Sequence, residues 1–413
     1  MRTKSSLIYF VLYLLFAMWV SSIAACKKSA PEKEAPESPT TGNRTQFTLD
    51  SIFLYAKHTY VWNAALPNYA DFNPRKYNGL ASDLLNFKKE VFELSRYAPN
   101  PLTKLPYEHT TLPGLAKYSY IEVASGDVGK IAATNAVPDE SVPSALVVGT
   151  NACLSLKQFR HLKGLKAELD AIFSDFAGKE IMGLIIDLRG NSGGYVETAQ
   201  YLADLIANTA MNGKVMYSEH FNAELQQGKA GILKNQPYLD ENNKQVYVNG
   251  RKATYADIDF SVKGNTFLFE KKGKLNTLNT IYFLVNGGTA SASELLINSL
   301  RPYFNTMLIG SRTYGKPVGS FGIRIDHHTL YITNFLIRNA QGAGDYFEGL
   351  PADISVSDSE IGNEMEQIIN NTLALANGKK QVIFGISRIQ AEIMPFKRIA
   401  NPVMIKQELK LKP

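Results

Sequence analysis

The stretch GLIIDLRGNSGG, Gly183–Gly194, gives the clearest indication of the fold. An apolar run from Ile181 to Ile186 is interrupted only by one glycine, which is typical of a strand that is buried on both faces. A glycine-rich loop, Asp187–Gly194, follows it. Two similar apolar runs, Ile281–Val285 and Met307–Ile309, also end in loops of glycine or small residues. Together these patterns predict a layered α/β architecture.

Helices are expected between and around these strands, because apolar side chains recur there at helical spacing. Leu162–Phe176 and Ala199–Ile206 each carry one apolar stripe, which is typical of a helix that packs on a core. Further helices are expected at Thr48–Tyr60, with Thr48 as the cap, at Ser82–Tyr97, and at Ile361–Leu373.

The composition is that of an ordinary globular chain of 413 residues, with 45% hydrophobic and 20% charged residues. The net charge of +6 is modest, and no basic stripe is interleaved with aromatic residues, so nucleic acid is not an expected partner. The chain has only two cysteines, Cys26 and Cys153, and its six histidines form no dense cluster. A structural metal site and a disulfide framework are therefore both unexpected.

The first 26 residues have the pattern of a secretory signal: a charged start, an apolar run from Leu7 to Val20, and small residues up to Cys26. The ending Ile23–Cys26 resembles a bacterial lipobox, in which the cysteine thiol receives the lipid. The alternative is an uncleaved membrane anchor with an incidental cysteine. Residues 27–43 are rich in proline and charge, which is typical of a flexible tether. The expected location is the cell envelope, lipid-anchored in the outer membrane and facing the periplasm or the cell surface.

Two loops follow predicted strands at the position where an α/β fold places its active site. In Asp187–Gly194, consecutive glycines allow backbone N–H groups to face an oxyanion, although taken alone the glycine pair is better explained by a simple turn. The second loop, Asn286–Glu294, places Ser291 at the start of an apolar helix. Ser291 and Glu294 form a capping-box pattern that requires no catalysis. Ser291 is also a candidate nucleophile, with the N–H of Ala292 facing the oxyanion.

A serine nucleophile requires a base, and the residues leave two kinds open. His327 and His328 lie in a strand-like segment, Gly322–Phe335, so their side chains are expected on opposite faces. A histidine from elsewhere in the chain also stays possible. Lys316 lies in a turn after the strand that ends at Ile309, and it can accept a proton only if burial lowers its pKa.

Four stretches, in this order along the chain, resemble the C-terminal processing proteases, also called tail-specific proteases, which are Ser-Lys peptidases. The resemblance implies an α/β, crotonase-like core with a ββα spiral, preceded by a small N-terminal helical domain. Residues 55–67 are also similar to the N-terminal extension of lipoprotein members. The four stretches are GLIIDLRGNSGG (183–194), VNGGTASASELL (285–296), IGSRTYGKPVG (309–319) and GLPADISV (349–356).

The resemblance implies a role for each matching residue. The family's nucleophile falls on Ser291, and its base, the lysine of the Gly-Lys turn, falls on Lys316. The acidic helper three residues after the nucleophile falls on Glu294. The oxyanion hole would be formed by the backbone of Ala292 and of one glycine of the pair Gly193–Gly194. The resemblance implies a protein or peptide substrate and no metal or cofactor, and it leaves the oligomeric state open.

Two features depart from the family pattern. Pro317 follows the Gly-Lys turn where glycine is common, which removes one backbone donor near the base. Members usually carry a PDZ module before the catalytic core, but only about 50 residues lie between Tyr97 and Val147, at the short edge of the domain range. A PDZ module is therefore expected to be truncated or absent.

The expected function is that of a serine endopeptidase that cleaves unfolded or extended protein segments in the cell envelope through a Ser-Lys dyad. One alternative is a catalytically inactive relative that binds extended peptides as an envelope assembly factor. Another is a crotonase-like enzyme that acts on an acyl thioester. The expected parts of the chain are a signal peptide (1–25), a lipid-anchored linker (26–45), an N-terminal helical region with a linker (46–115), the catalytic core (116–358), and a C-terminal helix with a basic tail (359–413).

Overall fold

A computed structural model describes residues 38–124, 142–240, 244–378, 404–405 and 409–412. The chain divides into two units, Met1–Gly42 and Asn43–Pro413, and nearly all described residues belong to the second. The predicted signal peptide and Cys26 lie outside the described residues, as does part of the region where a PDZ module would lie. Within the described ranges, the structure contains no helix with the length and apolar character needed to cross a membrane.

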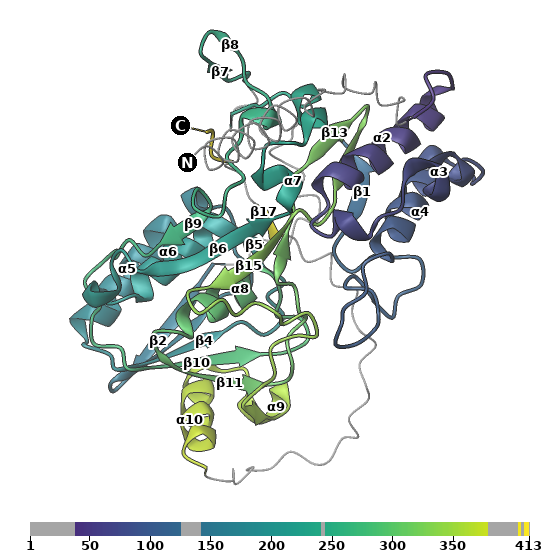
Figure 1. Ribbon diagram of the computed structural model, residues 1–413. Helices are drawn as coiled ribbons and strands as arrows, with labels where there is room; N and C mark the ends of the chain where they lie inside the picture. Colours follow the sequence, from purple (N-terminus) through teal and green to yellow (C-terminus); the bar gives the residue numbers. More distant parts are fainter. Residues whose placement is uncertain (1–37, 125–141, 241–243, 379–403, 406–408, 413) are drawn as a thin grey trace, which may run out of the picture. The chain divides into compact units, whose positions relative to one another are not determined.

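A six-stranded sheet forms the centre of the predicted catalytic core (Figure 1). Five of its strands run parallel, and only β2 is antiparallel to its neighbour. This sheet confirms the predicted α/β class, and the three predicted strands are β4, β10 and β11. In sheet order the strands are β16 (Ile354–Ser355), β11 (Asn305–Gly310), β10 (Thr280–Val285), β4 (Gly183–Asp187), β3 (Asn151–Ser155) and β2 (Ser144–Val148).

Helices cover both faces of this sheet. Successive strand residues point to opposite sides, and both sides carry apolar side chains that have to be buried. In β4, Leu184 and Ile186 belong to the main core with α5 (Lys166–Gly178), α6 (Val196–Ile206) and α8 (Ala292–Leu300). Ile185 belongs instead to a second cluster, with residues of α9 (Asp358–Ile361) and α10 (Met365–Ala376). The helices predicted near 162–176, 199–206 and 361–373 therefore form, although a break separates α9 from α10.

A second, antiparallel sheet lies on the other side of α8 and contacts it through β6 and β15. The helix that follows Ser291 is thus held between two sheets, and all nine of its residues are buried. The strands, in sheet order, are β12 (Val318–Gly319), β15 (Phe335–Asn339), β6 (Val215–Phe221) and β9 (Thr266–Leu268).

The N-terminal helices α2 (Arg44–Thr59) and α4 (Asp83–Ser95) pack against each other, and both contact a three-stranded sheet. The sheet has the order β1 (Tyr120–Val123), β14 (His328–Tyr331) and β13 (Ile323–Ile325). The remaining α-helices and strands are short: α3 (Tyr69–Phe72), α7 (Ala223–Gln226), β5 (Gly194–Tyr195), β7 (Tyr247–Val248), β8 (Arg251–Lys252) and β17 (Met404–Ile405).

Two local predictions were wrong. The first helix begins after Asn43 rather than at Thr48, because Asn43 and Gln46 form a capping box in which each side chain accepts from the other's backbone N–H. The segment expected to be one strand is a hairpin, which turns at Asp326, where φ is 54°, before His328. The two adjacent histidines therefore lie at a turn and at the start of β14.

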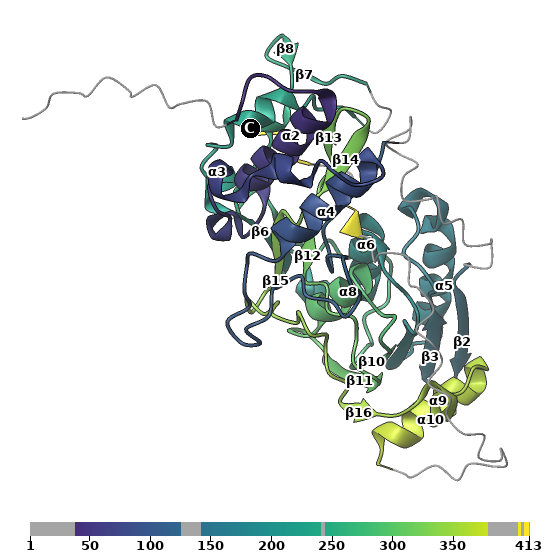
Figure 2. The ribbon, with the colours of Figure 1, turned by 90° about the vertical axis from the view of Figure 1, so that its right-hand side faces the viewer.

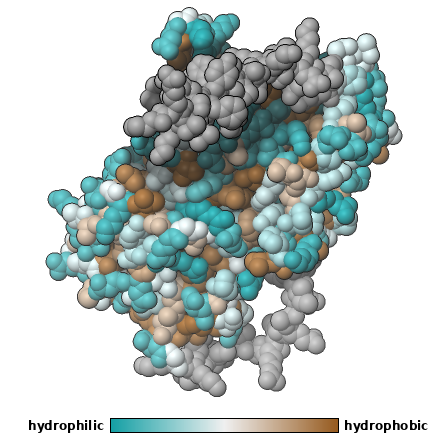
Figure 3. All heavy atoms as spheres, in the orientation of Figure 1, coloured by the Kyte–Doolittle hydropathy of each residue, from teal (hydrophilic) through white to brown (hydrophobic). Residues whose placement is uncertain are grey.

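On the face drawn in Figure 3, hydrophobic residues lie in small groups separated by hydrophilic ones. Scattered exposed apolar side chains of this kind are normal for a folded chain. The described residues that are visible on this face therefore give no indication of a large apolar docking surface.

Candidate active site

Three loops meet at the carboxyl ends of β4, β10 and β11, because β10 lies between the other two strands in the parallel part of the sheet. Two backbone hydrogen bonds connect the loops. Ala290 N–H donates to the carbonyl oxygen of Asn191 at 3.0 Å, and Tyr314 N–H donates to that of Thr289 at 3.0 Å. The two loops singled out in the sequence are therefore neighbours, and the turn with Lys316 adjoins them.

Ser291 occupies the position before the first residue of α8, in a backbone conformation that L-residues rarely adopt, with φ 60° and ψ −114°. Its side chain is fully buried, and its Oγ has no hydrogen-bond partner. A buried hydroxyl without a partner costs free energy, and so does strained backbone at a non-glycine residue. The Ser291 hydroxyl is therefore held in a state that an ordinary helix cap would avoid.

Glu294 connects the serine to the lysine turn through both carboxylate oxygens. One oxygen, Oε2, accepts from the backbone N–H groups of Ser291 at 2.9 Å and Lys316 at 2.8 Å. The other, Oε1, accepts from the Thr313 hydroxyl at 2.5 Å and from Gly315 N–H at 2.7 Å. The pKa of Glu294 is raised, because the effect of burial outweighs the opposite effect of these hydrogen bonds. One carboxylate thus fixes the backbone on both sides of the site.

Lys316 is buried, with 3% of its surface exposed. Burial lowers the pKa of its amine to about 8, against the opposing attraction of Glu108 and Glu294. An ordinary lysine is almost wholly protonated at neutral pH, whereas an amine with a pKa near 8 has a substantial neutral fraction there. The burial that the lysine hypothesis requires is therefore present.

The glycine pair lies on the other side of the serine. A Cβ at Gly193, where φ is 101°, would lie 2.6 Å from the Cβ of Ser291 and 2.9 Å from the backbone nitrogen of Ala292. Only glycine fits so close to these atoms. The Gly193 N–H donates to the side-chain oxygen of Asn191 at 2.9 Å, and Gly194 adjoins the carbonyl of Phe159. Gly193 and Ala292 thus flank Ser291.

Sequence reasoning missed Glu108, which lies in a stretch interpreted as part of a linker. Its side chain is 2% exposed, and its pKa is raised by burial. It accepts from the backbone N–H groups of Tyr118 and Ser119 and from the hydroxyls of Ser119 and Thr333. The Tyr118 hydroxyl donates to the carbonyl of Gly315 at 2.5 Å, directly before Lys316. No local pattern marks this glutamate, because its contact with Thr333 and the contact of its loop with Gly315 join residues about 200 positions apart.

Cys153 lies fully buried in β3, and burial raises the pKa of its thiol to about 12. A thiol in this state is a poor nucleophile at neutral pH. In the described part of the chain, no group of three or more His, Cys, Asp or Glu side chains is arranged to hold a metal ion.

The sequence profile of peptidase family S41 matches residues 151–356, which include all three loops. The chain belongs to peptidase family S41. This confirms the resemblance to the C-terminal processing proteases. The core that carries Ser291, Glu294 and Lys316 is the part that the S41 profile covers.

Among S41 relatives, a carboxy-terminal-processing protease of Bartonella bacilliformis is 25% identical over 220 residues, which are 51% of this chain and 39% of that protein. The chain thus matches well under half the length of this curated relative. Two solved structures are also similar. The photosystem II D1 C-terminal processing protease has 12% identity and a TM-score of 0.49, covering 80% of this chain and 97% of that one. A peptidase structure from Parabacteroides merdae has 14% identity and a TM-score of 0.48, covering 82% and 96%.

Proposed function

We propose that this protein is a serine endopeptidase that cleaves unfolded or extended protein segments through a dyad of Ser291 and Lys316. The observation that carries the proposal is the Glu294 carboxylate, which accepts from the backbone of both residues and so fixes the two relative to each other. A helix cap alone would give no reason for a buried lysine with a lowered pKa in the same hydrogen-bond network.

In the proposed reaction, the Oγ of Ser291 attacks the scissile carbonyl carbon while the neutral amine of Lys316 takes the hydroxyl proton. The carbonyl oxygen becomes an oxyanion, which accepts from the Ala292 N–H and from a donor in the loop Gly193–Gly194. Lys316 then gives its proton to the leaving amine nitrogen, and the C–N bond breaks. A water molecule releases the acyl group by the reverse sequence, with Lys316 again taking and returning the proton.

Glu294 has a positioning role in this proposal, since its oxygens are occupied by backbone and hydroxyl donors. The preorganised backbone means that little reorganisation is needed when charge develops. The proposal also includes the predicted division of the chain. The catalytic core is residues 116–358 and includes a crotonase-like spiral, the N-terminal helical region is residues 46–115, and the C-terminal part is residues 359–413.

The proposed location is the cell envelope, with the lipid anchor on Cys26 after removal of residues 1–25. It is supported by the apolar run that ends in Ile23–Cys26. A single acyl chain binds membranes only marginally, so several chains would be needed. Changing Cys26→Ser is expected to move the protein out of the membrane fraction. An unchanged membrane fraction with a mature N-terminus elsewhere would contradict the proposal.

The test of the activity is the incubation of the purified mature protein with unstructured proteins, with wild type compared to Ser291→Ala. Cleavage is expected to fall by about 10⁴-fold or more in that variant. Ser299→Ala is the matched control, because Ser299 is also buried on α8 with an unpartnered hydroxyl. It should cleave like wild type.

This comparison also tests the inactive alternative. A protein that binds extended peptides but does not cleave them, in wild type and both variants, would contradict the enzyme and identify a peptide-binding relative.

A further inference from the structure

The short strand β5, Gly194–Tyr195, has partners on both edges. On one edge, Tyr195 N–H donates to the carbonyl of Phe159 at 2.8 Å, and Phe159 N–H donates to that of Gly193 at 3.0 Å. On the other edge, β17 pairs with it in parallel, with Met404 opposite Gly194 and Ile405 opposite Tyr195. Both edges of the strand that continues the glycine loop are therefore occupied, and Figure 1 shows β17 beside β5.

This pairing places β17 at the proposed active site. Gly194 directly follows Gly193, whose backbone lies against Ser291. β17 also contacts β12, Val318–Gly319, which begins two residues after Lys316. Figure 2 shows β17, in yellow, near β12. Residues 404–405 thus lie between the loop with the glycine pair and the strand that follows the proposed base.

Residues 409–412 hold this part of the chain in place by pairing with a loop near β9. The carbonyl of Leu409 accepts from the Tyr238 hydroxyl at 2.6 Å, and Leu409 itself is 6% exposed. The carbonyl of Lys410 accepts from Asp259 N–H at 2.8 Å. Lys412 N–H donates to the carbonyl of Asp257 at 2.8 Å. These contacts follow the pattern of an added antiparallel strand, with Leu411 opposite Ile258.

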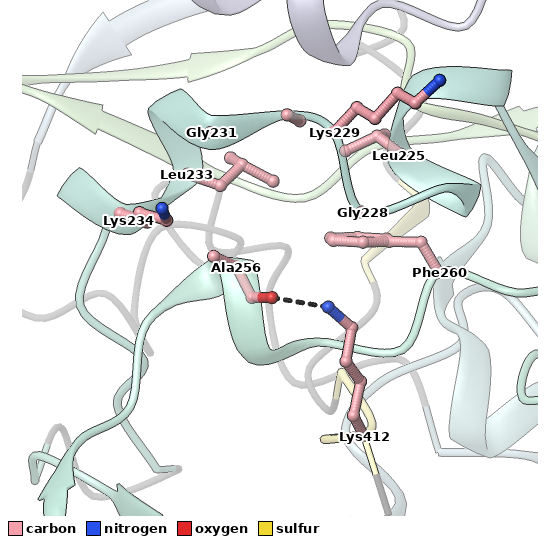
Figure 4. Close-up of a pocket in the computed structure, with 10 residues that line it drawn as sticks. Leu225, Gly228, Lys229, Gly231, Leu233, Lys234, Ala256, Phe260 and Lys412 are labelled. Carbon is pink, nitrogen blue, oxygen red and sulfur yellow. Dashed lines mark hydrogen bonds between the residues drawn. The ribbon is translucent and has the colours of Figure 1, made fainter. Parts of the chain in front are cut away.

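The two lysines add further contacts. The amine of Lys412 donates to the carbonyl of Ala256 at 2.8 Å, beside a pocket that Phe260 also lines (Figure 4). The amine of Lys410 lies 4.6 Å from the ring centroid of Phe267 and donates to the carbonyl of Gly264 at 3.1 Å. The stems of such side chains cover apolar surface while the amines stay at its rim.

We propose that residues 404–405 and 409–412, here called the docked segment, act as an intramolecular competitor of the substrate. An extended polypeptide that pairs with β5 next to Ser291 has to displace the docked segment, because one strand edge accepts one partner. This inference rests on the proposed function, since it names the mode of substrate binding and the regulation of the same site. The pairing at β5 spans only two residues, so an incoming strand can exchange with it.

Attachment to the same chain gives the docked segment a high effective concentration, which a separate substrate has to overcome. The contacts of residues 409–412, rather than the residues of the dyad, then set how readily the docked segment leaves β5. Loss of the contacts at residues 409–412 is expected to raise the affinity for substrate without any change in the dyad.

The test measures the binding of a fluorescent unstructured peptide to full-length protein in the Ser291→Ala background, where nothing is cleaved. Adding Leu409→Asp places a carboxylate in a buried apolar position and is expected to release the docked segment. The affinity for the peptide should rise on the order of tenfold. Leu102→Asp, at an 82% exposed leucine, is the matched control and should change nothing. A milder variant, Tyr238→Phe, removes only the hydroxyl that holds Leu409 and should give a smaller rise.

Hydrogen exchange at residues 409–412 reports the release itself. Released residues with an unchanged peptide affinity would overturn the proposal. If Leu409→Asp fails to fold, the same comparison is made with Tyr238→Phe. With Ser291 restored, kcat/KM for cleavage should rise by the same factor. If peptide binding rises but no variant cleaves, the docked segment competes with substrate but the proposed enzymatic activity is wrong. If wild type and Leu409→Asp cleave equally well, the activity stands and the proposed competition is wrong.

Discussion

Two lysines in different regions of the molecule have a pKa lowered to about 8, and only one lies in the proposed active site. Lys316 is fully enclosed, in a turn bound to the carboxylate that also binds Ser291 N–H. Lys271 lies in the loop after β9, where partial burial lowers its pKa and Asp204 raises it. Its amine donates to the carbonyl of Leu205 at 3.0 Å, in the last turn of α6.

The two lysines differ in the groups that surround their amines. A cation near the last carbonyls of a helix stabilises the helix end, so the hydrogen bond of Lys271 has a structural explanation. Lys316 lies in a network with a strained serine whose hydroxyl is unpartnered. A lowered pKa is therefore a useful indication of a base only when a group that can lose a proton belongs to the same hydrogen-bond network.

The largest expected effect comes from replacing each lysine by arginine. Lys316→Arg should lower cleavage by about 10³-fold, because a guanidinium stays protonated and cannot accept the serine proton. Lys271→Arg keeps a cation at the helix end and should cleave like wild type. The measurement is kcat/KM for an unstructured peptide, with thermal unfolding as the check on folding. Near wild-type cleavage by Lys316→Arg would rule out the dyad and favour a distant histidine as the base.

The pH dependence of kcat/KM should depend on Lys316 and not on Lys271. The neutral amine is the active form, so log kcat/KM should rise with pH below about 8 and level off above that pKa. At pH 6 the rate should be about 100-fold below the plateau, since only about 1% of the amine is neutral. Lys271→Met should leave this profile in place. A profile that levels off near pH 6.5 would indicate a histidine instead.

Glu294→Gln should lower kcat by about 10²-fold, because an amide offers one acceptor oxygen where the carboxylate has two. Its NH₂ group would face backbone N–H donors, either those of Ser291 and Lys316 or that of Gly315. Thr313→Val is the milder control, because it removes one hydroxyl donor to Glu294, and the acceptor of Leu350 N–H, but keeps the carboxylate. Unchanged kcat in Glu294→Gln would mean that the carboxylate does not hold the active geometry.

Glu108→Gln should move the pH profile to lower pH. The negative charge of Glu108 raises the pKa of Lys316, so its removal should lower that pKa further. Thr333→Val keeps the charge and removes one donor to Glu108, so it should leave the profile in place. The readout is the midpoint of the rise in kcat/KM with pH, which a purely structural role would not move. An unshifted midpoint in Glu108→Gln would show that this glutamate only supports the fold.

The strands and loops of the core were predictable from the sequence because they depend on local pattern. Each apolar strand ends in a glycine or serine cluster, as at Gly193 and Ser291, and the parallel order of the strands brings these ends together. Glu108 was not predictable, because the contacts of its loop with the Lys316 turn join residues about 200 positions apart, as in the bond from Tyr118 to Gly315. The same holds for the pairing of β17 with β5.

The smallest effect is expected at Cys153. This thiol is fully buried on the face of β3 that packs against α10, and its pKa of about 12 leaves almost no thiolate at pH 8. Cys153→Ala should therefore cleave like wild type and lose only about 1 kcal/mol of stability, since it removes one small apolar group. Cys153→Ser should also cleave, but it buries a hydroxyl and should be the less stable of the two by about 1 to 3 kcal/mol. Cleavage rates and thermal unfolding, measured side by side, check both. Loss of cleavage in Cys153→Ala with the fold retained would point to a cysteine nucleophile, because nothing in the Ser291 and Lys316 network depends on that thiol.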